Sequence, residues 1–452
     1  MTIGLSRGGH SAAAWRNWAG NQVARPQRTA VPRSPDEVAE EIRKAADDGL
    51  TVRMVGTGHS FSPIAMTDGV LLYPSGLTGI RSVDPAAGLV TVEAGCQLRV
   101  LNAELAARGL SLANMGDVHV QTAAGATQTG THGTGRDSGG MAAQVAGLEL
   151  VLADGTIVTC SADSAAGAPG TGQPQAGLFD AARVGLGALG IVTAVTFRVV
   201  PLFLLEAHEE AMHWSEVISR LDELTSQNEH FEFYWFPHTE DCLTKRNNTS
   251  PGPPQPLSRA RYLDTDEFLS NTVYGVTCRL GHMFPALIPV VNGVAVRALA
   301  GRNYTDVPYR VFTSPRRVRF KEQEYAVPRE SAADILAEVR ALFARRDWRI
   351  SFPIEVRFAP GDDPWLSTAY GRDSAYIAIH IYHASAHQEY FRDVEAVMTA
   401  AGGRPHWGKM HTRTAEQLSA AYPEFRQFVA LRDELDPERR FGNAYLTQVI
   451  GP

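Results

Sequence analysis

Two glycine-rich loops constrain most strongly what this chain can fold into. The first, at 56–62, follows a predicted strand, and its alternating small residues let several backbone N–H groups face one anion. Hydroxyls from Thr57, Ser60 and Ser62 add further donors. The second, at 125–135, is so rich in glycine and threonine that its backbone can lie flat against a large ligand. Either loop alone would be an ordinary turn, but two of them about seventy residues apart favour a phosphate-bearing cofactor.

A third glycine pattern matches the GxGxxG sequence motif of a dinucleotide-binding turn: Gly185-Leu186-Gly187-Ala188-Leu189-Gly190. That mechanism requires a strand before the turn and a helix after it, so that the pyrophosphate meets a helix N-terminus. Here a predicted strand follows, at 191–200. We therefore interpret the pattern as close helix–strand packing rather than as a cofactor site.

The two halves of the chain follow different patterns, which predicts an α+β fold in two domains. The first half alternates helices and strands until Pro201, where we place a boundary. Its clearest elements are a capped helix after Ser34, hairpins at 80–94 and 148–160, and a surface loop at 161–177. The second half has long alternating strands at 231–235, 318–320 and 377–381 and helical patterns at 214–227 and 331–346. This predicts an antiparallel sheet covered by helices.

Composition excludes several classes of protein. A net charge of −7 argues against non-specific nucleic-acid binding. The start of the chain, 1–13, lacks the apolar core of a secretory signal, and the apolar stretch at 283–296 is short and broken by prolines. The four scattered cysteines suggest free thiols in a reducing compartment. We expect a cytoplasmic protein without a transmembrane segment, with peripheral membrane contact as a second option.

Several polar residues of the second half are candidates for a ligand site. On the strand 352–358, Glu355 and Arg357 share one face, and taken alone this pair favours a solvated surface. His380 and Tyr382 share a face of a later strand, and Lys409 follows beside a tryptophan; together these groups suit a polyhydroxylated ligand. A basic cluster is interpreted as another solvated strand face rather than a partner surface: Arg316, Arg317, Arg319 and Lys321.

A metal site is not predicted. His380, His383 and His387 cannot converge from a strand, because neighbouring side chains alternate faces and His383 points away from His380. His406 and His411 also lack the spacing of helical ligands, and no HExxH or Walker motif is present.

Taken in order, short motifs along nearly the whole chain resemble the sugar-lactone oxidase branch of the vanillyl-alcohol-oxidase flavoprotein superfamily. This branch includes L-gulono-1,4-lactone oxidases and dehydrogenases and D-arabinono-1,4-lactone oxidases, with alditol oxidases close by. The motifs are those at 17–22, 56–62, 131–135, 187–193, 355–357, 406–409, 435–437 and 441–446.

The resemblance implies FAD as cofactor. It implies an FAD-binding domain at 1–201, a substrate-binding cap at 202–410, and a final segment, 411–452, that returns to the FAD domain. The loop 56–62 would hold the pyrophosphate, and His59 matches the position that bonds covalently to the flavin 8α-methyl. The implied cofactor-binding residues are Gly56, Thr57, Gly58, His59, Ser60, Phe61, Ser62, Gly116, Asp117, Thr122, Gly125, Thr129, Gly130, Thr131, His132 and Ile191.

The resemblance also implies the reaction. Glu355 and Arg357 match the family's substrate-binding pair and Lys409 its active-site lysine; His380 is our candidate for the base. We expect oxidation of an aldono-1,4-lactone beside its carbonyl, with hydride transfer to flavin N5. Gly116 matches the position that controls dioxygen access, and the electrons would go to dioxygen or another acceptor.

Three alternatives stay open at this point. An alditol oxidase acting on a primary hydroxyl is the first, although Asp117 stands where those enzymes carry serine. A flavin-binding protein without turnover and a metal-dependent hydrolase are the others.

Overall fold

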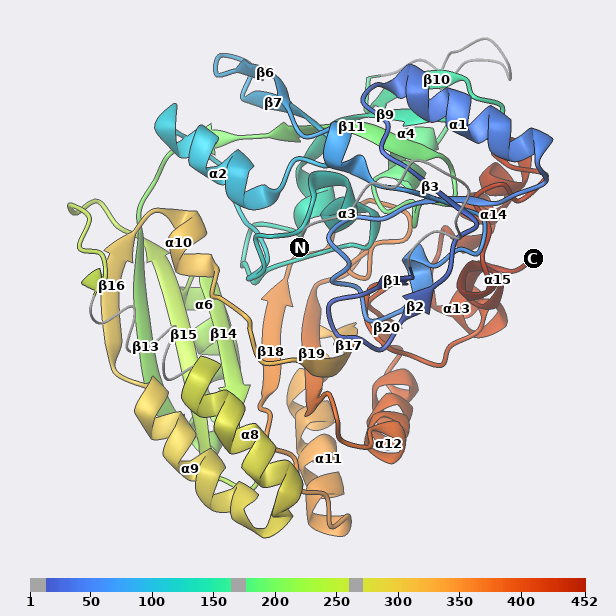
Figure 1. The fold of residues 1–452 in the computed structure, drawn as a ribbon. Helices are drawn as coiled ribbons and strands as arrows, with labels where there is room; N and C mark the ends of the chain where they lie inside the picture. The colour runs from blue at the N-terminus through green and yellow to red at the C-terminus, as the bar shows by residue number, and fades with distance from the viewer. Residues whose placement is uncertain (1–13, 164–175, 260–270) are drawn as a thin grey trace.

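The computed structural model describes residues 14–163, 176–259 and 271–452, and it confirms the α+β fold (Figure 1). Most of the surface loop predicted at 161–177 lies outside the described residues. In the first part of the chain, a parallel sheet has the order β3 (Arg28–Ala30), β5 (Val70–Leu72), β4 (Val52–Met54). An antiparallel sheet has the order β10 (Ile157–Ser161), β9 (Val145–Val151), β11 (Ile191–Arg198), β7 (Leu89–Glu93), β6 (Ile80–Asp84). Two small pairs complete this part: β1 (Trp15–Arg16) with β2 (Val23–Ala24), and β8 (Leu110–Ser111) with β12 (Val200–Pro201).

Helices of this part pack against the two sheets. In α1 (Pro35–Asp47) the Ser34 hydroxyl accepts from the N–H of Glu37, as the capping pattern predicts. The predicted helix after the first hairpin is α2 (Leu98–Ala107), and α4 (Leu178–Ala182) precedes β11. The second glycine-rich loop begins with a short helix that we did not predict, α3 (Ala123–Gln128), started by the Thr122 hydroxyl.

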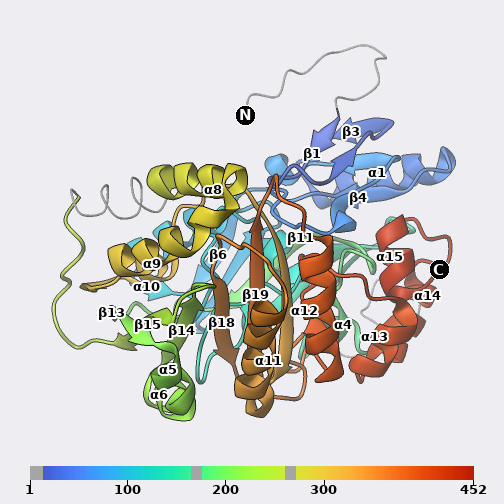
Figure 2. The same ribbon diagram turned by 90° about the horizontal axis from the view of Figure 1, so that it is seen from below.

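The second part is built on one eight-stranded sheet with antiparallel pairing throughout. The strand order is β16 (Arg302–Asp306), β13 (Leu205–His213), β15 (Asp241–Thr249), β14 (His230–Trp235), β18 (Ile354–Ala359), β19 (Ser374–Tyr382), β17 (Phe320–Pro328), β20 (Arg404–Pro405). Figure 2 shows one face covered by α5 (Trp214–Ser219), α6 (Leu221–Gln227), α11 (Ala332–Arg345) and α12 (Gln388–Ala400). The single helix predicted at 214–227 is therefore two helices, which meet at Arg220. On the other face lie α8 (Tyr274–Met283) and α9 (Ile288–Leu299), and α10 (Pro308–Phe312) follows β16. Within the described part of the chain, no helix combines the length and the hydropathy that crossing a bilayer requires.

Alternation along the central strands sorts their side chains into two environments. Phe231, Phe233 and Trp235 of β14 pack into the helix-covered core with Ile377 and Ile379 of β19. The alternate positions are mainly polar and face the first part of the chain. The sheet therefore directs a row of buried charged groups toward the first part of the chain.

The final helices α13 (Ala415–Ala421), α14 (Phe425–Leu435) and α15 (Ala444–Ile450) pack into the core of the first part. Leu418, Phe428 and Val449 belong to the same buried cluster as Val90 and Leu101. This placement agrees with a returning segment; the boundaries at 201 and 410 stay a prediction.

A loop of the first part is joined to the cap sheet by hydrogen bonds. The Thr134 hydroxyl donates to the carbonyl of Phe231 (2.5 Å) and accepts from the N–H of Phe358 (3.1 Å). The N–H of Gly135 donates to the carbonyl of Phe358 (2.8 Å). Neighbouring ends of β14 and β18 are thereby fixed to the second glycine-rich loop.

Candidate active site

The two glycine-rich loops and the turn before β11 enclose a pocket with about 910 Å³ of space not filled by atoms. The loops touch where glycine is required. A Cβ on Gly56 would lie 2.8 Å from the Thr122 hydroxyl oxygen, and one on Gly125 would lie 2.7 Å from it. Gly58 has φ +74°, which an L side chain rarely adopts. A bare backbone cradle of this kind fits a dinucleotide such as FAD.

Most of the predicted cofactor residues line this first pocket. They are Gly56, Thr57, Gly58, His59, Ser60, Ser62, Thr122, Gly125, Thr129 and Ile191. Phe61, Gly116, Asp117, Thr131 and His132 line a second, adjoining pocket instead, and Gly130 lines neither. At Gly116 an added methyl group would lie 3.0 Å from the His132 carbonyl oxygen and 3.1 Å from the Thr131 methyl carbon, so close packing also favours glycine here.

The turn that we assigned to packing also contributes to the cradle. A strand, β11, follows it as expected, but Leu186, Gly187 and Gly190 line the first pocket. The glycine pattern therefore does mark part of a cofactor cradle, although no helix follows it as the dinucleotide-binding turn requires.

Arg53 holds this turn in place. Its buried guanidinium donates to the carbonyls of Leu186 (2.8 Å), Gly187 (2.7 Å), Ile64 (2.7 Å) and Phe441 (2.9 Å). Burial lowers the pKa of Arg53 to about 10, while Asp436 acts to raise it, and the group remains charged at neutral pH. One side chain thus joins the cradle to the carboxy-terminal segment.

The second pocket brings together all four predicted catalytic residues, Glu355, Arg357, His380 and Lys409. They come from β18, β19 and the segment after β20. Four further residues line both pockets, so the two are continuous: His59, Ser60, Gln121 and Thr129. The solvated surface that Glu355 and Arg357 favoured when taken alone is wrong, because both are buried.

Arg357 lies among three carboxylates. Its Nε donates to Glu232 (2.8 Å), and its Nη2 contacts Glu355 and lies 3.5 Å from Asp117. Burial raises the pKa of Glu355, and the charges of Asp117 and Glu232 raise it further against the opposing effect of Arg357. The Tyr234 hydroxyl donates to Glu355 (2.7 Å) and fixes its orientation.

Lys409 and His380 meet at Glu322. The ammonium of Lys409 lies 2.5 Å from one Glu322 oxygen, and Nε2 of His380 lies 3.4 Å from the other. The second ring nitrogen of His380 is 3.1 Å from the carbonyl of Pro353, which can only accept, so Nδ1 carries a proton. In neutral His380 the lone pair is therefore on Nε2.

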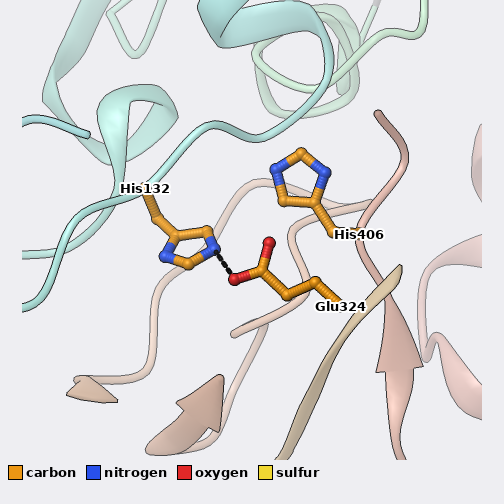
Figure 3. A group of neighbouring side chains, drawn as sticks. All are labelled: His132, Glu324 and His406. Atoms are coloured by element: carbon orange, nitrogen blue, oxygen red, sulfur yellow. Dashed lines mark ion pairs between the residues drawn. The ribbon is translucent and has the colours of Figure 1, made fainter. Parts of the chain in front are cut away.

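A related arrangement joins His132, Glu324 and His406 (Figure 3). Nε2 of His132 lies 3.2 Å from Glu324, and its Nδ1 lies 3.0 Å from the carbonyl of Gly133. Both nitrogens thus face acceptors. Nδ1 of His406 accepts from the N–H of Gly408 (3.0 Å), so the Nε2 of neutral His406 carries the proton. His132 is thus paired with Glu324, and His406 lies beside this pair with its Nδ1 lone pair already used by the N–H of Gly408, so the group does not offer three open lone pairs to a cation.

Asp117 and Arg316 form an ion pair across the two parts of the chain. Burial would raise the pKa of Asp117, but Arg316 and Arg357 outweigh it and hold the pKa below its usual range. The solvated strand face predicted for the basic cluster is wrong at Arg316, which precedes β17 and lines the second pocket.

Sequence reasoning also missed Glu322 and Glu324. They stand two residues apart on β17, a spacing that places both on one face of a strand, as with Glu355 and Arg357. That spacing was the available signal.

His59 lies where the two pockets meet. The Trp18 ring stacks on it at 5.4 Å between centroids. Burial and, to a smaller extent, the charge of Lys409 lower the pKa of His59 to about 4 against the opposing effect of Asp117. The imidazole is therefore neutral at physiological pH.

A dinucleotide cradle continuous with a buried, charged pocket defines a flavin-dependent oxidoreductase, and an FAD-binding domain pattern matches residues 26–161. The chain belongs to the D-arabinono-1,4-lactone oxidase family, whose pattern matches residues 195–449. It is 42% identical over 97% of its length to an L-gulono-1,4-lactone dehydrogenase of Mycobacterium tuberculosis, of which 99% is covered.

Other relatives agree. An L-gulonolactone oxidase of Bos taurus is 34% identical, over 98% of this chain and 99% of the relative. An alditol oxidase of a Streptomyces species is 31% identical, over 97% and 99%. The fold matches that of a solvent-stable cholesterol oxidase with a TM-score of 0.82, at 20% identity over 96% of each chain. The protein is thus an FAD-dependent enzyme of the lactone oxidase and dehydrogenase family.

Proposed function

We propose that the enzyme oxidises an aldono-1,4-lactone of the L-gulono-1,4-lactone type at the alcohol carbon next to the lactone carbonyl. The observation that carries this proposal is the placement of Arg357 and Lys409 in a pocket continuous with the cofactor cradle. Bound FAD would supply the hydride acceptor, N5, and the route by which electrons reach dioxygen or another acceptor.

The side chains of the second pocket have complementary roles in this proposal. Arg357 and Lys409 stabilise the negative charge that develops on the substrate oxygen. Glu355 orients Arg357 and accepts a hydrogen bond from a substrate hydroxyl. His380 accepts the hydroxyl proton at Nε2, the nitrogen that bears its lone pair when the ring is neutral.

The substrate class is tested by anaerobic reduction of the bound flavin. L-gulono-1,4-lactone is expected to bleach the flavin absorbance at a rate that saturates with concentration, whereas xylitol at equal concentration bleaches it far more slowly. Reduction by xylitol alone would instead identify an alditol oxidase. A yellow protein that neither compound bleaches would contradict the proposal.

Replacing His380 with glutamine is expected to lower the rate of flavin reduction at saturating lactone about 100-fold, because the proton acceptor is lost. Anaerobic stopped-flow absorbance measures this rate. His383→Gln is the matched control, since His383 follows the same strand but does not line the second pocket. A rate for His380→Gln within about threefold of wild type would remove His380 from the role of base.

We further propose that FAD is bonded covalently to His59. A neutral imidazole buried against Trp18 is a competent nucleophile toward the flavin 8α-carbon. The bond would form after the 8α-methyl loses a proton, and the two electrons left on the flavin would pass to dioxygen or another acceptor. After acid denaturation, wild-type protein is expected to retain yellow colour and flavin fluorescence on a denaturing gel, whereas His59→Ala releases all its FAD. His119→Ala, outside both pockets, should retain it.

The pKa of His59 gives the same proposal a pH test. Because the imidazole is neutral above about pH 4, attachment of FAD to apoprotein should be equally fast at about pH 6 and about pH 8. An ordinary histidine would be largely protonated, and slower, at the lower of these pH values. Covalent flavin in His59→Ala would disprove the linkage.

A further inference from the structure

Exposed apolar side chains are concentrated on one helical hairpin. Among the described residues, nine large hydrophobic side chains are exposed, and seven of them lie between residues 276 and 294. We call these seven the hairpin patch; they are 38–68% exposed. They are Val276, Leu280, Met283, Phe284, Leu287, Val290 and Val294.

The spacing of the patch places it on one side of the hairpin. Steps of three and four residues, the period of a helix face, relate Val276, Leu280 and Met283 on α8 and Val290 and Val294 on α9. Phe284 and Leu287 lie in the turn between the two helices. The inner side is already packed: Cys278 and Val296 are buried, and a Cβ on Gly281 would meet Ile288 at 2.9 Å. Figure 1 shows the hairpin at the edge of the cap remote from the FAD-binding sheets. The patch is therefore not needed for the hairpin to pack on the cap.

The charge around the hairpin is opposite to that of the chain. Residues 271–321 contain eight lysines and arginines and one acidic residue in a protein of net charge −7, and three of the eight are paired with carboxylates: Arg302, Arg310 and Arg316. Arg279, Arg317 and Arg319 share a surface depression with Val276 and His383. Arg297, at the far end of α9, is also exposed. These arginines, which we call the cationic rim, thus adjoin the apolar patch.

We propose that the hairpin patch docks the enzyme on an anionic lipid bilayer as a peripheral protein. The apolar side chains would enter the boundary between headgroups and acyl chains, while the arginines contact the lipid phosphates. An amphipathic hairpin with a basic rim offers both interactions that favour binding to such a bilayer, which are burial of apolar side chains and attraction to anionic headgroups. A second copy fits less well, because a symmetric contact through this patch would bring two cationic rims together.

The experiment is co-sedimentation of the flavin-loaded enzyme with vesicles. Phosphatidylcholine vesicles containing about 30% phosphatidylglycerol are expected to bind it, with binding falling as salt is raised, and pure phosphatidylcholine vesicles to bind at least about tenfold less. Phe284→Ser/Leu287→Ser/Val290→Ser should lower partitioning onto the anionic vesicles at least about tenfold. Arg279→Glu/Arg319→Glu should do the same through charge.

The matched control removes the two remaining exposed hydrophobic side chains, Val31 and Val100, which lie elsewhere. Val31→Ser/Val100→Ser should bind vesicles as wild type does. Every variant should keep its flavin content, thermal unfolding temperature and turnover of soluble lactone. Absence of binding to anionic vesicles, equal loss in the control, or a wild-type dimer that the hairpin substitutions dissociate would overturn the proposal.

Discussion

The Arg357→Ala enzyme is expected to oxidise L-gulono-1,4-lactone with a kcat/KM about 10³-fold below wild type while keeping its FAD. The guanidinium is buried and directed into the second pocket by Glu232 and Glu355. The two other cations that line this pocket are held by carboxylates of their own, Lys409 by Glu322 and Arg316 by Asp117. The loss should appear mainly in kcat, because the charge it stabilises develops in the transition state.

Two measurements separate this effect from damage to the fold. The visible spectrum and the thermal unfolding temperature show whether the cradle is intact, since Arg357 lines only the second pocket. Arg357→Lys should recover only part of the rate, because an ammonium cannot bond two carboxylates in the fixed geometry of a guanidinium. A kcat/KM for Arg357→Ala within about threefold of wild type, with FAD bound, would contradict the assigned role.

Replacing Arg53 with methionine is expected to lower the free energy of unfolding by at least about 3 kcal/mol and to weaken FAD binding. The substitution keeps much of the apolar volume but removes the donors to carbonyls of the turn at 186–187 and of Phe441. Those backbone groups would be left buried without this partner. The turn lines the first pocket, so its displacement should release the cofactor.

Denaturant unfolding of the apoprotein measures the stability change, and FAD titration measures the binding change. Arg43→Met is the matched control: Arg43 is exposed, and its one bond to the Gly155 carbonyl is long, at 3.4 Å. It should change the unfolding free energy by no more than about 0.5 kcal/mol. An Arg53→Met protein as stable as this control would show that the buried guanidinium does not hold the cradle together.

Local patterns predicted much of this molecule. The Ser34 cap, the two hairpins and the alternation along 377–381 are each determined by neighbouring residues, and all appear as expected. The cofactor loops were found for the same reason, because a backbone that must approach a ligand needs glycine in a short stretch. The residue pattern placed Glu355, Arg357 and Lys409 among the candidates for a polyhydroxylated ligand, and the motif resemblance then gave each of them a role.

Contacts between distant segments were not predictable in this way. Asp117 and Arg316 stand 199 residues apart, and their pairing depends on how the cap sheet meets the FAD-binding part. The sequence spacing showed that Glu322 and Glu324 lie on one face of a strand, but it did not show the strand order that places β17 beside β19. His406 joins Glu324 only because the chain returns along that sheet as β20.

The hydrogen bonds of Thr134 and Gly135 to the cap sheet have a consequence for how substrate exchanges. They join the second glycine-rich loop to the cap sheet, and they therefore oppose a hinge motion that would separate the two parts of the chain. If the pocket is already formed before substrate binds, none of the free energy of substrate binding is used to close the two parts of the chain.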